Sequence, residues 1–210
     1  MHTGRVGHCM KQNTYHHKNL KNELIEKGIE IVNESGLEQL SLRKVAMACN
    51  VSHAAPYSHF KSKEELIGAM QSHITEQFTV KLEEAILKYE GKPNFLLEFG
   101  KAYITFFMEK PQYFQFLFQQ GHMPLDLNLE GECEEGYKPF IIYKRQILKL
   151  LEHTDLSPEK KQDCVISLLA YIHGLTSLVT MPNVTYDPGW ENKLEDLIMT
   201  YRADFGADMR

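Results

Sequence analysis

Residues 40–66, LSLRKVAMACNVSHAAPYSHFKSKEEL, are the stretch that decides the fold. The first part has apolar residues at the i, i+3, i+4, i+7 spacing of one helix face, namely Leu42, Val45, Ala46 and Cys49. Ser41 precedes this stripe and is a preferred N-cap residue. Asn50 follows it, and Asn is the residue that best tolerates a positive φ after Gly. The stretch therefore predicts two short helices joined by a tight turn, which is a helix-turn-helix.

The second half of the stretch is expected to form the helix that enters a DNA major groove. It begins at Ser52, and the small side chains of Ala54 and Ala55 keep it slim enough to approach the bases. His53 and Tyr57 add hydrogen-bonding groups to it. Four basic residues around the motif are candidate phosphate anchors: Arg43, Lys44, Lys61 and Lys63.

Helical periodicity continues on both sides of this motif. An apolar face runs from about residue 18 to Gly36, which is expected to end that helix as a left-handed cap. Ser62 and Glu65 form a capping box that opens a long helix over 63–89. Further helices are expected at 94–109, 111–121, 133–153, 158–181 and 190–205, and no strand is expected. The predicted fold class is all-α with about nine helices, in which a three-helix helix-turn-helix head precedes a C-terminal helical-bundle body.

The motif resembles the TetR family of bacterial transcription regulators. The shared pattern is VS, four residues, then Y-x-H-F-x-x-K-x-x-L, matched by Val51, Ser52, Tyr57, His59, Phe60, Lys63 and Leu66. The preceding helix also ends in the ESG of residues 34–36, and the resemblance covers about residues 20–74. One departure is Pro56, where many members carry Thr or Leu.

The Ala-Ala-Pro-Tyr version of the motif resembles one branch of the family. That branch tends to carry a Trp/His/Gly signature in a late helix. His173 and Gly174 fit the signature, but Leu169 stands where its aromatic residue is expected. The chain therefore matches this branch only in part.

The resemblance implies a repressor that binds a palindromic operator as a homodimer and is released by a small, largely apolar molecule. A co-repressor-dependent or metal-responsive regulator of the same fold remains an alternative, and a small-molecule-binding protein or an enzyme is a less favoured one. Three segments are implied: a flexible arm at 1–17, a helix-turn-helix domain at 18–63, and a ligand-binding and dimerisation domain at 64–210. The residues expected to bind DNA are Ser41, Arg43, Ser52, His53, Ala54, Ala55, Tyr57, Ser58, His59, Lys61 and Lys63.

Within this set, the resemblance assigns two kinds of contact. Tyr57, His59 and Lys63 match positions that hold operator phosphates. Residues 52–55 match positions at the base edges. Phosphate contacts set the position on the duplex and most of the salt dependence, whereas base contacts set the sequence choice.

The charge distribution agrees with a nucleic-acid contact at one end of the chain. Residues 1–63 carry nine Lys/Arg and five Asp/Glu, whereas residues 64–210 carry fourteen Lys/Arg and 23 Asp/Glu. The net charge of −5 therefore combines a basic head with an acidic body. Chance variation in surface charge would give the same split.

Aromatic residues are concentrated in the body. Nine of the 22 aromatic side chains fall within residues 95–118. Such a density fills a core or lines a cavity for an apolar ligand, and the sequence does not separate the two. The family resemblance favours a pocket, with Tyr103, Phe107, Phe114, Phe118, His122 and Tyr143 as its expected ligand-binding residues.

The last two expected helices carry broad apolar stripes. Paired with those of a second subunit, they would form a four-helix bundle like that of the family's dimers. Burial of both stripes within one chain is the alternative. The residues expected at the dimer interface are Leu168, Ile172, Leu175, Val179, Leu194, Leu197, Ile198 and Tyr201.

Other classes of protein are disfavoured. The sequence holds no GxSxG, P-loop, HExxH or GxGxxG motif, so neither catalysis nor a cofactor is expected. No uninterrupted apolar run reaches the length of a membrane span, and the first residues lack a secretory signal. Four scattered cysteines without a CxxC spacing suit free thiols in a reducing cytosol, so a cytoplasmic protein is expected.

Two further functions of the N-terminal arm are considered, namely metal binding and DNA contact. It holds a cluster of possible metal ligands: His2, His8, Cys9, His16 and His17. Their spacing matches no closed metal site, so no metal is expected. The basic residues Arg5, Lys11 and Lys18 could instead reach along the DNA backbone or into the minor groove.

Overall fold

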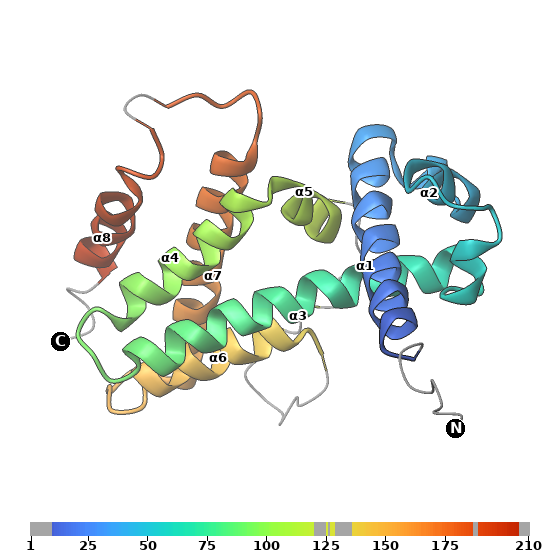
Figure 1. Ribbon diagram of the computed structural model, residues 1–210. Helices are drawn as coiled ribbons and strands as arrows, with labels where there is room; N and C mark the ends of the chain where they lie inside the picture. Colours follow the sequence, from blue (N-terminus) through green and yellow to red (C-terminus); the bar gives the residue numbers. More distant parts are fainter. Residues whose placement is uncertain (1–9, 120–124, 126, 129–135, 187–188, 206–210) are drawn as a thin grey trace, which may run out of the picture. The chain divides into compact units, whose positions relative to one another are not determined.

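The computed structural model describes residues 10–119, 125, 127–128, 136–186 and 189–205, with the side chains of 10–19, 119 and 201–205 left out. Over these residues the protein is all-helical, as the sequence predicts, with eight α-helices and no strand (Figure 1). The α-helices are α1 Met10–Ser35, α2 Leu42–Ala48, α3 Lys63–Tyr89, α4 Phe95–Glu109, α5 Pro111–Phe114, α6 Lys138–Leu150, α7 Pro158–Thr180 and α8 Leu194–Phe205. Two 3-10 helices, η1 Leu37–Gln39 and η2 Ala55–Ser58, and a π-helical segment, η3 Gln115–Gln119, complete the described secondary structure.

The chain divides into two compact units, Met1–His73 and Ile74–Arg210, which we call the head and the body. The division lies inside α3, ten residues beyond the boundary expected from the sequence. Helix α3 therefore contributes its first three turns to the head and its remaining turns to the body.

The first helix begins earlier than the sequence analysis expected. Helix α1 starts at Met10, so residues 10–17 of the expected flexible arm are helical. The expectation relied on apolar periodicity, which is absent from this segment. Residues 10–27 contain no Gly or Pro, however, and a helix can therefore continue through them without an apolar face.

The head is held together by a small apolar core from α1, α2 and the start of α3. Its fully buried side chains include Leu24, Ile29, Val45 and Leu66. Gly28 lets α1 approach closely, because a Cβ atom at this position would lie 3.0 Å from the sulfur of Met70 on α3. These contacts hold α2, the first helix of the DNA-binding motif, against α1 and α3.

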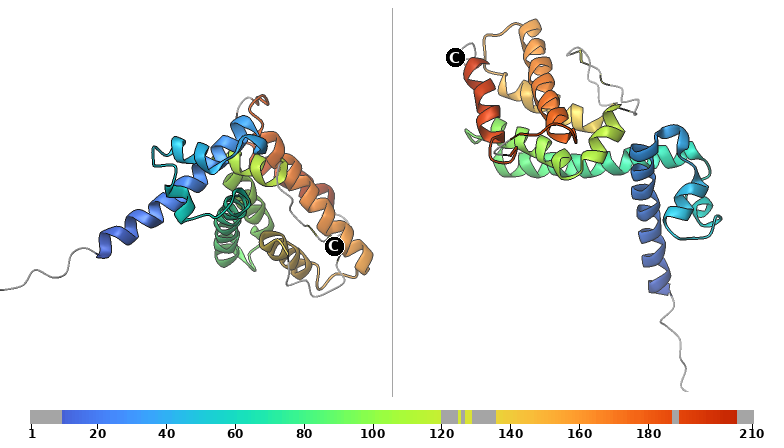
Figure 2. Two further views of the ribbon diagram at one scale, coloured as in Figure 1. Left: turned by 90° about the vertical axis from the view of Figure 1, so that its right-hand side faces the viewer. Right: turned by 90° about the horizontal axis from the view of Figure 1, so that it is seen from above.

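Helix α4 is the centre of the body. It is apolar nearly all round, as expected, and packs against α5, α7 and α8 (Figures 1 and 2). At Gly100 a Cβ atom would lie 3.2 Å from the Cδ1 of Ile172, so glycine allows α4 and α7 to come close together. Helix α6 contacts α7, and an aromatic cluster fills the space around α4.

Candidate nucleic-acid interface and apolar cavity

The turn of the helix-turn-helix has the geometry that the sequence predicts. The Ser41 side chain accepts a hydrogen bond from the backbone N–H of Lys44 at 3.2 Å and so caps α2. Asn50 has a φ of 54°, the only positive value among the described residues other than glycine. The Val51 N–H then donates to the carbonyl oxygen of Ala46 at 3.0 Å, which closes the turn.

The second element of the motif differs from expectation, since no α-helix begins at Ser52. It is the four-residue 3-10 helix η2, Ala55–Ser58. In an α-helix the N–H of residue 56 would donate to the carbonyl of Ser52, but Pro56 has no N–H. The Ala55 N–H donates to this carbonyl instead, at 2.9 Å, which is the i to i+3 bond of a 3-10 turn.

The expected DNA-binding residues differ in how far their side chains are exposed to solvent. Ser41, Arg43, Ser52, His53, Ala54, Tyr57, Ser58 and Lys61 are exposed, whereas Ala55, His59 and Lys63 are half-buried. Tyr57 is 53% exposed although it is aromatic, so its ring is available to a partner. Ser41 and Ser58 also serve the local fold, because the Ser58 hydroxyl donates to the carbonyl of Ala55 at 2.7 Å.

The capping box at the start of α3 is present, but one of its two hydrogen bonds involves a different residue from that of the standard box. The Glu65 N–H donates to the Ser62 hydroxyl at 3.3 Å. The Glu65 carboxylate accepts from the N–H of Lys61 at 2.6 Å, one residue earlier than in the standard box. The backbone N–H of Glu64 and the Ser62 hydroxyl lower the pKa of the Glu64 carboxyl. The segment that carries Lys61 and Lys63 is therefore anchored to the helix N-terminus.

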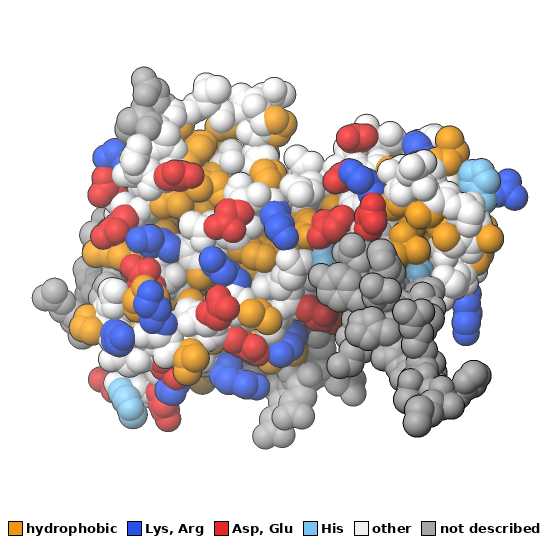
Figure 3. All heavy atoms as spheres, viewed as in Figure 1, with side chains coloured by type: hydrophobic (Ala, Val, Ile, Leu, Met, Phe, Trp, Pro, Cys, Tyr) orange, Lys and Arg blue, Asp and Glu red, His pale blue; other side chains and the backbone are white. Residues whose placement is uncertain are grey.

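On the surface of the body, several basic side chains are paired with acidic ones. On the face drawn in Figure 3, acidic and basic side chains alternate over the body. Lys101, for example, lies 3.6 Å from the carboxylate of Glu98 and 3.4 Å from that of Glu195. Positive groups that are paired in this way offer little to a polyanion, so the head is the better candidate for a nucleic-acid contact.

The body contains an apolar cavity of about 290 Å³. Its walls come from α3, α4, the π-helical segment, α6 and α7, together with described residues of the connection between the π-helical segment and α6. The lining residues are Phe78, Tyr103, Phe118, Leu125, Leu127, Tyr137, Pro139, Phe140, Tyr143, Ile166, Leu169, Ala170 and His173. The volume is near the lower end of the range for small-molecule sites.

Three of the six expected ligand-binding residues line this cavity: Tyr103, Phe118 and Tyr143. Phe107 and Phe114 do not line it, because they are buried in the aromatic core, with their ring centroids 5.3 Å apart. His122 lies outside the described residues. Helical periodicity indicates that an aromatic side chain is buried, but both a packed core and a cavity wall satisfy that pattern.

Two polar lining residues were not expected from the sequence, namely Tyr137 and His173. His173 did carry a signal, since Ile166, Leu169, Ala170 and His173 recur at the spacing of one face of α7. Tyr137 lies within the helix expected over 133–153, three residues before Phe140, but α6 begins at Lys138 and Tyr137 is its N-cap residue.

The hydroxyl and imidazole groups of the cavity are partly paired with one another. The Tyr103 hydroxyl and the Nδ1 of His173 are 3.1 Å apart. Burial lowers the pKa of His173 and raises that of Tyr103, so both are uncharged at neutral pH. The Tyr143 hydroxyl donates to the carbonyl of Val165 at 2.7 Å.

The expected dimer residues fall into two groups. Leu175, Leu194 and Ile198 are buried within the chain, in a cluster with Leu97 and Ile104 of α4. Ile172, Val179 and Leu197 are partly buried and pack against this cluster from within the same chain. Leu168 is partly buried and does not belong to the cluster. The backbone of Tyr201 lies in α8, but its side chain is outside the described set.

Helix α7 stands out among the described helices because it is long and apolar enough to cross a membrane, with 23 residues and a mean hydropathy of 1.4. Core helices of soluble proteins have the same properties. Only 22% of its apolar stretch is buried within the chain, on the side where α7 packs against α4 and lines the cavity.

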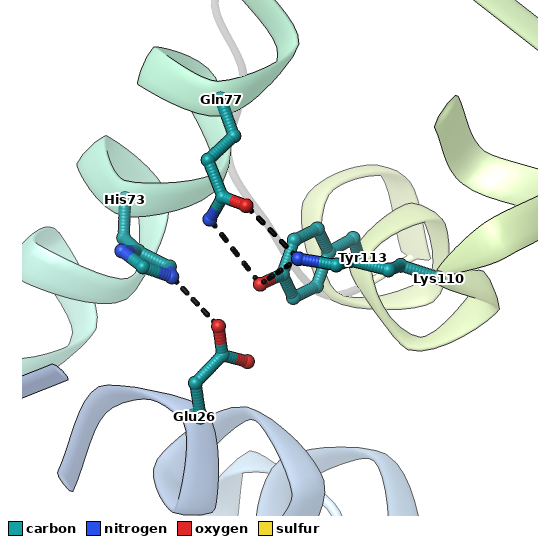
Figure 4. Close-up of polar contacts among 5 residues, drawn as sticks. All are labelled: Glu26, His73, Gln77, Lys110 and Tyr113. Carbon is teal, nitrogen blue, oxygen red and sulfur yellow. Dashed lines mark hydrogen bonds and ion pairs between the residues drawn. The ribbon is translucent and has the colours of Figure 1, made fainter. Parts of the chain in front are cut away.

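Two polar clusters lie one turn apart on α3 (Figure 4). In the head, the Nε2 of His73 lies 2.8 Å from the carboxylate of Glu26 on α1. In the body, the Lys110 ammonium donates to the side-chain oxygen of Gln77 at 2.9 Å and to the Tyr113 hydroxyl at 3.2 Å. The Gln77 amide also donates to this hydroxyl, at 3.3 Å. The first contact lies within the head, and the second cluster lies within the body.

Within the described part of the chain, no group of three or more His, Cys, Asp or Glu residues is arranged to hold a metal ion. The His-rich N-terminal cluster lies outside it, as residues or as side chains. Cys49 is buried in the head, and burial raises the pKa of its thiol. This makes Cys49 a core residue and not a reactive thiolate.

Comparison with known proteins points to one family. Residues 24–70 match the family model described as bacterial regulatory proteins, tetR family. This segment contains α2, the Asn50 turn, η2 and the start of α3. No curated protein matches the sequence.

Solved structures share the fold over nearly the whole chain. A protein of unknown function from Rhodococcus sp. RHA1 has a TM-score of 0.68 and 21% identity, over 93% of this chain and 98% of its own. A TetR-family transcriptional regulator from Haemophilus influenzae has a TM-score of 0.62 and 22% identity, over 87% and 94%. A TetR variant from Acinetobacter baumannii AYE in complex with minocycline has a TM-score of 0.56 and 18% identity, over 90% and 98%. At these identities the likeness is one of fold.

Proposed function

We propose that this chain, whose residues 24–70 match the tetR family model, is a ligand-responsive repressor of that family that binds a palindromic operator as a homodimer. The coarser statement, a DNA-binding transcriptional regulator with a helix-turn-helix, follows from the family itself. The observation that carries the proposal is the Asn50 turn, which sets a short element with exposed Ser52, His53 and Tyr57 beside α2.

We assign different tasks to the exposed side chains of the head. Tyr57, Lys61 and Lys63 hold operator phosphates, because they are hydrogen-bond donors or cations beside the motif. Ser52 and His53 read base edges, since they are exposed and precede η2. A short 3-10 element reads few base pairs, and a two-fold pair of heads is therefore required for a selective site.

The apolar surface of α7 and α8 supports the homodimer. In the single chain Leu178 of α7 is 46% exposed, Met181 directly after α7 is 41% exposed, and Met199 of α8 is 40% exposed. A second copy that packs on this surface would remove these side chains from water and form a four-helix bundle. Leu175, Leu194 and Ile198 then stabilise each subunit from within. Leu168 and the exposed parts of Ile172, Val179 and Leu197, which otherwise pack against that cluster, contribute to the interface.

The cavity is the proposed effector site, where a small, largely apolar molecule binds without being converted. Phe78 of α3 lines the cavity, and five residues earlier on the same helix His73 contacts Glu26 of α1. A ligand that displaces Phe78 would therefore act on the helix that carries the head. It needs only a preference of a few kcal/mol for one arrangement to change operator affinity.

The test is binding to DNA fragments from just upstream of the protein's own gene, at two salt concentrations. We expect tight, selective binding that weakens as salt rises. Lys63→Ala should weaken it and lower the slope of log K against log salt by about one per subunit. Tyr57→Phe should weaken binding further with little change in that slope.

The matched control is Lys160→Ala, which removes one positive charge from the body. Lys160 pairs with Asp163 on the surface and should leave operator binding unchanged. If selection from random DNA also yields no preferred sequence, the regulator proposal is wrong.

A further inference from the structure

The described walls of the cavity carry no charged side chain. Among its described lining residues there is no Asp, Glu, Lys or Arg. Nine of these thirteen residues are apolar, and the other four are three tyrosines and His173. The one group that could become cationic is His173, and burial lowers its pKa. A carboxylate or ammonium ligand would lose its hydration here without finding an opposite charge.

Each hydroxyl in the wall has a distinct bonding state. The Tyr143 hydroxyl is already used, because it donates to the carbonyl of Val165 at 2.7 Å. The Tyr103 hydroxyl bonds to the Nδ1 of His173 at 3.1 Å. The Tyr137 hydroxyl is fully enclosed and lies beside the Thr75 side chain, whose hydrogen bond lowers the pKa of this phenol against the larger, opposite effect of burial.

The Tyr103–His173 pair holds one donor that its mutual hydrogen bond does not use. A phenol and a neutral imidazole carry two polar hydrogens between them, and their mutual bond uses one. If the Tyr103 hydroxyl donates to Nδ1, the Nε2–H of His173 is left. If Nδ1–H donates, the Tyr103 O–H is left. Neither tautomer gives this donor a further partner among the described residues.

The imidazole is held in place by aromatic rings. The ring of His173 lies 4.9 Å from that of Phe114 and 4.7 Å from that of Phe118, edge to face in the second case. Because Phe118 also lines the cavity, the imidazole and an aromatic surface are offered to the same occupant. A fixed donor beside an aromatic wall favours a ligand whose acceptor is attached to a flat apolar body.

We propose that the cavity selects an uncharged, mostly apolar ligand bearing one carbonyl or hydroxyl oxygen, and that the Tyr103–His173 pair binds this oxygen. The inference rests on the proposed function in taking the cavity as the effector site. It adds the chemical class of the effector and the two residues that determine its selection. Tyr103 and His173 are specificity-determining residues in this scheme.

Three naphthalenes of nearly equal shape test it: 2-acetylnaphthalene, 2-ethylnaphthalene and 2-naphthoate. Their binding to the full-length protein at neutral pH is followed by the fluorescence of the naphthalene ring. One neutral hydrogen bond contributes about 1 kcal/mol, so the ketone should bind about fivefold to tenfold more tightly than the hydrocarbon. The carboxylate should bind more weakly than the ketone by at least tenfold.

Two variants assign the effect to residues. The double variant Tyr103→Phe with His173→Leu removes the whole pair, and the ratio of ketone to hydrocarbon affinity should fall to about one. Tyr143→Phe is the matched control, since it removes a hydroxyl that is already bonded within the protein. Its ratio should remain that of the wild type.

Equal binding of ketone and hydrocarbon, tightest binding of the carboxylate, or no binding of the ketone would each overturn the inference. So would a ratio that survives in the double variant. Operator binding is measured separately without any probe. Selective operator binding with no preference for the ketone refutes this inference alone, whereas the preference without operator binding refutes the proposed function.

Discussion

Replacing Phe107 by Ala should destabilise the protein far more than the same change at Phe118, although the sequence placed both in one pocket. Phe107 is fully buried and does not line the cavity. Phe118 is half-buried and has the cavity on one side. The neighbours of the Phe107 ring, by centroid distance, are Phe78 at 4.7 Å, Phe106 at 4.9 Å, Phe114 at 5.3 Å, Tyr103 at 5.5 Å and Phe118 at 5.8 Å.

The magnitudes follow from these surroundings. Phe107→Ala opens a void enclosed by five aromatic rings, and a change of this kind costs about 3–5 kcal/mol of unfolding free energy. Phe118→Ala removes a ring whose outer side already meets empty space, so fewer contacts are lost. Half the burial of a phenylalanine is worth about 1–2 kcal/mol.

The assay is urea unfolding of the wild type and both variants, followed by circular dichroism. The midpoints should fall in the order wild type, Phe118→Ala, Phe107→Ala, with similar m-values. Equal losses, or a larger loss at Phe118, would show that Phe107 faces the cavity and would refute the division of the aromatic cluster into core and wall.

Three further outcomes are expected in the same unfolding assay. Asn50→Ala should be less stable than Asn50→Gly by about 1 kcal/mol, because Ala is strained at a positive φ; greater stability of the Ala variant would contradict the turn geometry. Since burial lowers the pKa of His173, its contribution to stability is complete above the unfolded value of 6.5 and declines as the pH falls toward the folded value; His173→Gln should flatten this acid-side loss, and an unchanged pH profile would argue against it. Gly100→Val should cost about 1–3 kcal/mol by collision with Ile172, whereas Gly68→Ala in an open part of α3 should gain up to about 1 kcal/mol; a tolerated Val would show that α4 and α7 can separate.

Much of the candidate DNA site could be predicted from the sequence, because its determinants are local. Ser41, Asn50 and Ser62 act on backbone groups within a few residues of themselves, so their types and spacing suffice to indicate cap, turn and helix start. The 3-10 form of η2 was missed, although Pro56 carried the signal. Its absent N–H removes the bond to the Ser52 carbonyl on which an α-helix there depends.

The early start of α1 was missed for a related reason. Apolar periodicity marks the part of a helix that is buried, whereas α1 extends before its first core residue through a polar segment without a helix breaker. Apolar periodicity therefore predicts that this helix exists, but it does not predict the residue at which the helix starts.

The sequence by itself determined the helical class, the order of the helices and the turn at Asn50, because hydrogen-bond and capping chemistry acts between residues close in the chain. Only the tertiary structure decided which aromatic rings form the core and which line the cavity. Phe107 and Phe118 satisfy the same periodic pattern, and His173 meets Tyr103 across 70 residues of chain. The apolar spacing along a helix indicates which face is buried. Which surface covers that face depends on how distant helices pack, and the spacing of residues along the chain does not show this.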